Sequence, residues 1–105
     1  MVVRITRLNG ASMRETAMQM QCKTAEIAYR IGCREMGIYH YNAAVESNEI
    51  LGSRLDGVIA GLQWGDIVIC QFPTWNGLRF ERALVNHIKA YRGYVVIFIH
   101  DVVAM

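Results

Sequence analysis

The sequence predicts an α/β domain in which helices cover both faces of a parallel sheet of four strands. Short β-branched or aromatic runs alternate with longer segments whose apolar residues recur at helical spacing. Two of the runs, at 67–70 and 94–99, are apolar throughout. Continuous apolar runs are typical of strands that are buried on both faces of a parallel sheet. We therefore expect the order βαβαβαβ in a single Rossmann-like unit.

Length and composition limit the alternatives. The chain has 105 residues, 53% hydrophobic and 19% charged, which fits one folded domain over 1–105. Its formal net charge is +2 and its basic residues are scattered, so we expect no nucleic-acid partner. The apolar run at 94–99 is too short for a membrane span. An odd set of three cysteines (Cys22, Cys33 and Cys70) without a C-x-x-C pair and the lack of an export signal predict a cytoplasmic protein.

The first half of the chain predicts two strands and a helix between them. Strand character runs over 2–8 and stops at the turn signal Asn9-Gly10. A helix is expected over 16–31, with Gly32 as its stop signal. A second strand is expected over 35–41. The helix is expected to bury a stripe made of Ala17, Met20, Thr24, Ile27, Ala28 and Ile31.

The second half predicts two more helices and two more strands. A strand at 66–72 ends at Pro73, a helix covers 76–91, and the last strand covers 94–99. The helix that precedes the strand at 66–72 is expected to bury Ile50, Leu51, Leu55, Val58, Ile59 and Leu62. The helix at 76–91 is expected to bury Phe80, Leu84, Ile88 and Tyr91.

Right-handed crossovers favour the strand order 2-1-3-4, with one helix on one face and two on the other. The order of strands then reverses between the first and the third. Ligands of open α/β sheets bind beyond the carboxyl ends of the strands at such a reversal. We therefore expect the loops 9–15 and 72–77 to flank a crevice, with His100 and Asp101 at its rim.

The first loop has two interpretations. Asn9-Gly10 is either a plain turn or part of an anion site, but a single glycine is not the G-x-G-x-x-G pattern of dinucleotide-binding proteins. Ser12 or Thr16 either caps the following helix or contacts a ligand at its amino end.

The remaining candidates also have two interpretations. Asn76 could cap the next helix while Trp75 covers the core, or Trp75 could stack on a sugar ring. His100 and Asp101 are either a loop pair or a pair that orients or deprotonates a hydroxyl. His40 and His87 lack the spacing of metal ligands, and no metal site is predicted.

Four segments, spread over nearly the whole chain, match the pattern of a known family. They are NGASMRETA at 9–17, EMGIYHY at 35–41, RLDGVIAGLQWGDIVICQFPTWN at 54–76 and VIFIHDV at 96–102. With these segments the chain resembles the glucosyltransferases that act third in glycosylating bacterial serine-rich-repeat adhesins, and related galactofuranosyltransferase-like proteins. Members of that family resemble GT-B glycosyltransferases, whose two Rossmann-like domains face each other. The resemblance covers the amino-terminal, acceptor-side domain.

The resemblance implies roles for the candidate residues. Thr16 would lie near the diphosphate of a UDP-sugar donor, and Asn9 and Gly10, in the same loop, are expected to join that site. The cleft would be lined by Pro73, Thr74, Trp75 and Asn76. His100 and Asp101 would orient or deprotonate the acceptor. No metal or covalently bound cofactor is implied.

Three functions are weighed. The first is hexose transfer, with glucose as the expected sugar, from a UDP-sugar to a sugar on a glycosylated serine-rich protein. Family members continue beyond Met105 into a donor-nucleotide domain, so this chain alone is expected to be inactive. Homo-oligomers are expected because a sheet of four strands leaves an apolar edge, and because the resemblance implies them. The second is a non-catalytic assembly module or a truncated remnant of that family. The third, a receiver or flavin domain, is set aside because the strand at 66–72 contains Gln71 where a receiver has an aspartate.

Overall fold

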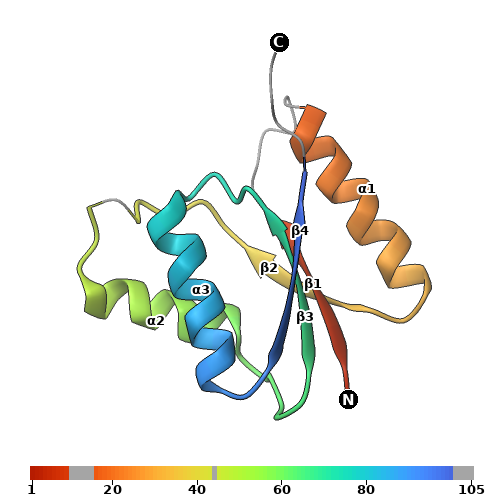
Figure 1. Ribbon diagram of the computed structural model, residues 1–105. Helices are drawn as coiled ribbons and strands as arrows, with labels where there is room; N and C mark the ends of the chain where they lie inside the picture. Colours follow the sequence, from red (N-terminus) through yellow and green to blue (C-terminus); the bar gives the residue numbers. More distant parts are fainter. Residues whose placement is uncertain (10–15, 44, 101–105) are drawn as a thin grey trace.

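The computed structural model describes residues 1–9, 16–43 and 45–100, and only the backbone of Thr16 and Ala17. Within these ranges it forms an α/β sandwich with the sheet between two layers of helices (Figure 1). Its elements are β1 (Val3–Leu8), α1 (Thr16–Arg30), β2 (Arg34–Ile38), α2 (Asn48–Val58), β3 (Ile67–Phe72), α3 (Leu78–Ala90) and β4 (Tyr94–Ile99). The expected order of elements is confirmed, although β2 ends at Ile38 and does not include residues 39–41 of the predicted strand.

The sheet has the order β2-β1-β3-β4 and all its neighbouring strands are parallel, as the sequence predicts. The central pairing joins β1 to β3, with Val3 opposite Ile67 and Ile5 opposite Ile69. One edge is β2, and the other is β4, which pairs with β3 along its full length. Strand order therefore reverses between β1 and β3, where a ligand crevice is expected.

Each face of the sheet has its own apolar core. The larger core lies under α2 and α3, and α1 covers a smaller one on the opposite face (Figure 1). In α3 the buried stripe is Phe80, Leu84 and Ile88, each fully buried, as expected from its spacing of four residues. Tyr91, which the prediction had added to this stripe, follows the helix and is exposed. The larger core consists of Met36, Ile38, Ala43, Leu51, Leu55, Ile59, Val68, Cys70, Phe80, Leu84 and Ile88.

The predicted buried face of α1 is wrong. Met20, Ile27 and Ile31 are exposed, and the face that meets the sheet contains Gln21, Ala25 and Ala28 instead. These residues also follow a helical spacing, but two of them are alanines, whose weak hydrophobic signal is masked in the sequence by larger apolar neighbours. Small side chains let the helix approach the backbone of the sheet closely. Of the three buried residues, only Ala28 is part of the predicted stripe.

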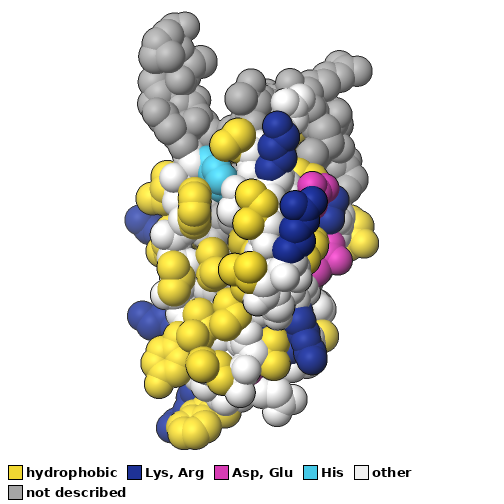
Figure 2. Space-filling model, turned by 90° about the vertical axis from the view of Figure 1, so that its right-hand side faces the viewer, with side chains coloured by type: hydrophobic (Ala, Val, Ile, Leu, Met, Phe, Trp, Pro, Cys, Tyr) yellow, Lys and Arg dark blue, Asp and Glu magenta, His cyan; other side chains and the backbone are white. Residues whose placement is uncertain are grey.

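The prediction that β4 is buried on both faces is also wrong. Five of its six residues are exposed, with Ile99 at 74% and Tyr94 at 65%. Val96 pairs with Ile69, so it faces the same side as α1, but α1 lies over β1 and β2. Figure 2 views the molecule from the right-hand side of Figure 1 and shows a band of hydrophobic side chains down that side. An apolar run identifies a strand but does not reveal whether a helix covers it.

At the amino end of the sheet, a buried carboxylate ties the chain together. Asp66 accepts hydrogen bonds from the backbone N–H groups of Gln63 (2.8 Å) and Val2 (2.9 Å), and Arg4 lies 3.7 Å away. The Gln63 hydrogen bond, then that of Val2, holds the pKa of Asp66 below its usual value, because both stabilise the charged form. The start of β1 is thereby joined to the turn that precedes β3.

We predict that the thiol of Cys70 does not react while the protein is folded. Its burial in β3 raises its pKa to about 12, three units above the ordinary value, which lowers the thiolate fraction roughly a thousandfold. In a Cys22→Ser, Cys33→Ser variant, a thiol reagent at pH 8 should label Cys70 only at the rate of unfolding. The same variant in denaturant is the control. Rapid labelling of the folded protein would contradict the burial of this side chain.

Candidate functional site

A buried polar cluster lies where the carboxyl ends of the strands meet. It contains Thr6 from β1, Gln71 from β3, Gln21 from α1 and His100, which follows β4 directly. Each of these four residues is at most 8% exposed. Polar side chains that are buried this fully need hydrogen-bond partners. Their contacts therefore decide what the cluster can do.

Gln71 is the centre of the cluster. Its backbone N–H donates to Thr6 Oγ1 (2.8 Å), and its side-chain Nε2 donates to the carbonyl oxygens of Thr6 (2.8 Å) and Gln21 (3.0 Å). Its Oε1 lies 2.7 Å from His100 Nε2. One amide thus connects β1, α1 and the residue after β4.

His100 is held on several sides. Its backbone N–H donates to the carbonyl oxygen of Phe72 (2.9 Å), which extends the pairing of β4 with β3 by one residue. Its ring stacks on Phe98, with the ring centres 4.6 Å apart. Burial lowers the pKa of His100, because a protonated imidazole loses hydration there. The neutral imidazole can accept a proton.

The loop after β3 is also fixed by polar contacts. The backbone N–H and Oγ1 of Thr74 both donate to Glu81 Oε2, at 2.7 and 2.9 Å. Gln21 Nε2 donates to the carbonyl oxygen of Pro73 (2.7 Å). The peptide bond between Phe72 and Pro73 is cis. Trp75 is half-buried and has a φ of 59°, a value that residues other than glycine seldom adopt. The backbone around Trp75 is therefore positioned by its neighbours.

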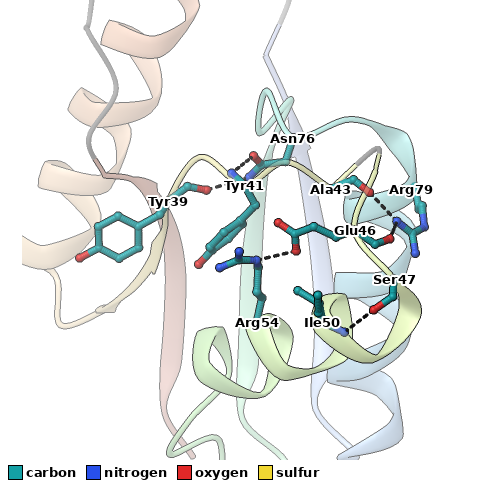
Figure 3. Close-up of polar contacts among 9 residues, drawn as sticks. All are labelled: Tyr39, Tyr41, Ala43, Glu46, Ser47, Ile50, Arg54, Asn76 and Arg79. Atoms are coloured by element: carbon teal, nitrogen blue, oxygen red, sulfur yellow. Dashed lines mark hydrogen bonds and ion pairs between the residues drawn. The ribbon is translucent and has the colours of Figure 1, made fainter.

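Asn76 binds the loop after β2 and does not cap α3. Its Oδ1 accepts from the N–H of Tyr41 (2.7 Å), and its Nδ2 donates to the carbonyl oxygen of Tyr39 (2.9 Å), as Figure 3 shows. The N-cap of α3 is Gly77, with a φ of 88°. One side chain therefore fixes the loop after β2 against the loop after β3.

Two arginines hold the rest of the loop after β2 (Figure 3). Arg79 of α3 donates to the carbonyl oxygens of Ala43 and Glu46. Arg54 of α2 pairs with the Glu46 carboxylate (2.6 Å) and lies over the ring of Tyr41. These contacts use both guanidinium groups to fix the loop after β2.

The other predicted site residues lie at the same end of the sheet or outside the described residues. The backbone N–H of Asn9 donates to the carbonyl oxygen of Ile38 (2.8 Å), and its side-chain amide lies over Gly37, which has no Cβ. Thr16 is the first residue of α1. Gly10 and Asp101 are outside the described residues. Their predicted roles stay predictions.

Sequence reasoning missed three members of the cluster: Thr6, Gln21 and Gln71. The signal that could have found Gln71 is a long polar side chain at the end of an otherwise apolar strand. Gln21 offers a similar signal, because it lies at a spacing of four and seven residues from the buried Ala25 and Ala28. Its Oε1 is buried and has no hydrogen-bond partner among the described residues.

Comparison with known proteins identifies the family. Residues 2–105 match the model of the family described as "Glucosyltransferase 3-like, N-terminal domain". The chain belongs to this family. It is 46% identical over 105 residues to glucosyltransferase 3 of Streptococcus parasanguinis, covering 100% of this chain and 32% of that protein. It is 39% identical over 102 residues to glucosyltransferase 3 of Streptococcus gordonii, covering 97% of this chain and 30% of that protein.

The match sets the scope of the site. The chain spans about a third of the length of these curated relatives, so this member of the family corresponds to their amino-terminal domain. Within the described ranges, no helix is long and apolar enough to cross a bilayer. The same ranges contain no group of three His, Cys, Asp or Glu side chains that could hold a metal ion.

We predict that Asn76→Ala destabilises the protein by about 2–4 kcal/mol, because it leaves the Tyr41 N–H and the Tyr39 carbonyl without their partner. The matched control is Asn86→Ala, an exposed asparagine of α3, which should cost less than about 0.5 kcal/mol. Urea unfolding followed by circular dichroism measures both free energies of unfolding. Equal effects of the two substitutions would show that Asn76 does not hold the two loops together.

Proposed function

We propose that this chain forms the acceptor side of a glucosyltransferase that uses a UDP-sugar, with UDP-glucose as the expected donor. The acceptor would be a sugar already attached to a serine-rich protein. The main support is His100, a buried and anchored imidazole at the carboxyl edge of the sheet, where strand order reverses nearby. The names of the two relatives support glucosyl transfer in general.

The proposed reaction needs a base for the acceptor hydroxyl. As the hydroxyl oxygen forms its bond to the anomeric carbon, its proton passes to the His100 imidazole. The bond between that carbon and the β-phosphate oxygen breaks, and the diphosphate leaves with the electron pair. Since burial favours the neutral form of His100, this ring is ready to accept the proton near pH 7. Asp101 is proposed to assist in orienting the acceptor.

The binding of the two substrates is proposed to use the loops at this edge. The half-buried indole of Trp75 would stack on a sugar ring of the acceptor, on a backbone supported by Thr74 and Asn76. The diphosphate would lie near Asn9, Gly10 and the amino end of α1, where Thr16 begins the helix and its dipole favours an anion. In a GT-B arrangement a second domain would hold most of the donor. The transfer is proposed to take place in the cytoplasm and to need no metal ion.

A second candidate function is that of a non-catalytic assembly module, and the exposed β4 favours it. Its free edge is bordered by exposed Ile97 and Phe98 on opposite faces, and Ile97 also lines a groove of about 380 Å³ beside α3. Unpaired strand edges with apolar flanks are templates for association. The occupant that this candidate requires is a second copy of the chain, which would also give the expected homo-oligomer.

The acceptor role predicts a specific effect of Trp75→Ala. In saturation-transfer NMR with a serine peptide bearing N-acetylglucosamine, the variant should lose the signal of the wild-type chain. The matched control is Trp64→Ala, which removes an indole that is 75% exposed and precedes β3 at the other end of the sheet. UDP-glucose is measured in parallel. Peptide binding that is equal in all three proteins, or absent from the folded wild type, would refute the acceptor role.

The assembly role predicts that Ile97→Lys is monomeric where the wild-type chain is a dimer. A lysine at this position places a charge beside the edge that would pair with the second copy. Ile27→Lys is the matched control, because Ile27 is 60% exposed on α1, away from β4. Sedimentation equilibrium over a range of concentrations measures the mass. A monomeric wild type, or dimers of all three proteins, would contradict pairing through β4.

A further inference from the structure

The orientation of the Gln71 amide can be assigned from chemistry alone. Its nitrogen contacts two carbonyl oxygens, those of Thr6 and Gln21, which can only accept hydrogen bonds. The reverse orientation would place the amide oxygen against both carbonyl oxygens and would lose two hydrogen bonds in a buried site. The amide oxygen must therefore face His100.

This orientation decides which nitrogen of His100 holds the proton. Gln71 Oε1 can only accept, so His100 Nε2, at 2.7 Å, must donate. In the neutral ring the lone pair is then on Nδ1. Among the described residues, Nδ1 has no hydrogen-bond partner.

The same contact restrains the direction of the ring. Gln71 is fully buried, and its amide is bound to β1 and α1 as well as to His100. Its backbone is also bound to Thr6 Oγ1. Rotation of the imidazole would break the bond to Oε1, and rotation of the amide would break two more. The ring is thus coupled to the centre of the sheet.

We propose that Gln71 is a positioning residue that holds His100 as its Nε2–H tautomer, so that Nδ1 is the atom that accepts the proton of the acceptor hydroxyl. The role in transfer rests on the proposed function, whereas the tautomer does not. When the acceptor oxygen bonds to the anomeric carbon and the diphosphate leaves, the proton on that oxygen moves to Nδ1. Nε2 keeps its hydrogen bond to Gln71 throughout, and the positive ring that forms is stabilised by the Oε1 dipole.

The test is the tautomer of His100 in the full chain, read from long-range ¹H–¹⁵N NMR spectra. The wild type should show one tautomer, with protonated Nε2, unprotonated Nδ1 and an Nε2–H that exchanges slowly with water. Gln71→Met keeps the length of the side chain but has no amide. In this variant we expect both tautomers and an Nε2–H exchange rate that rises roughly tenfold or more.

The matched control is Thr6→Val, which removes the hydroxyl that binds the Gln71 backbone but leaves the bonds of the Gln71 side chain. It should keep the single tautomer even though it loses a buried hydrogen bond. His87, which pairs with Asp56 at 2.6 Å on another part of the molecule, should not change in either variant. A merely structural role of Gln71 would disturb both histidines or neither.

Two results would overturn the proposal. One is a wild-type chain with Nδ1–H or a mixture of tautomers, which needs no variant and holds even if Gln71→Met fails to fold. The other is a folded Gln71→Met that keeps one slowly exchanging Nε2–H. A single tautomer in a chain that binds no acceptor peptide would support the positioning role and refute the proposed function. Acceptor binding by a wild-type chain with mixed tautomers would support the proposed function and refute the positioning role.

Discussion

The pairing of β1 with β3 is the constraint on which the rest of the structure depends. It joins Val3 to Ile67, two residues far apart in the sequence, in the middle of the sheet. Right-handed crossovers then place α1 on one face and α2 and α3 on the other, as Figure 1 shows. The helices that follow β1 and β3 in the chain, α1 and α3, therefore lie on opposite faces of the sheet. Because β1, β3 and β4 are parallel neighbours, Thr6, Gln71 and His100 lie together toward the carboxyl ends of these strands.

Much of the fold was predictable because its elements follow simple periods. The stripe of α3 is made of large apolar side chains that are buried where the helical period places them, and the strand order follows from the handedness of the connections. The errors have a common cause. Hydrophobicity alone cannot tell a small buried side chain, such as Ala25, from a large exposed one, such as Ile27. It also cannot show that β4 lacks a covering helix, because that depends on where α1 lies.

The position of the candidate site was predictable, but its internal contacts were not. Topology predicts that a site lies at the carboxyl ends of the strands. The place of His100 directly after an apolar strand predicts that this residue lies there. The contacts of Gln71 join segments 50 and 65 residues apart in the sequence, which no local pattern reveals. Likewise, Asn76 looks like a helix cap in the sequence, but in the fold its amide reaches the backbone of Tyr39 and Tyr41. Long-range polar partners require the three-dimensional arrangement.

The buried polar cluster provides geometry more than stability. A hydrogen bond inside a protein replaces one made to water, so an apolar cluster of equal volume could be as stable as this one. What apolar side chains could not supply is a fixed direction for an imidazole. His100 follows a strand that is largely exposed, so packing of β4 alone would leave the ring poorly restrained. Its contacts with Gln71 and the Phe72 carbonyl oxygen instead tie it to β3, at the centre of the sheet. The ring can therefore keep its position whatever comes to cover β4.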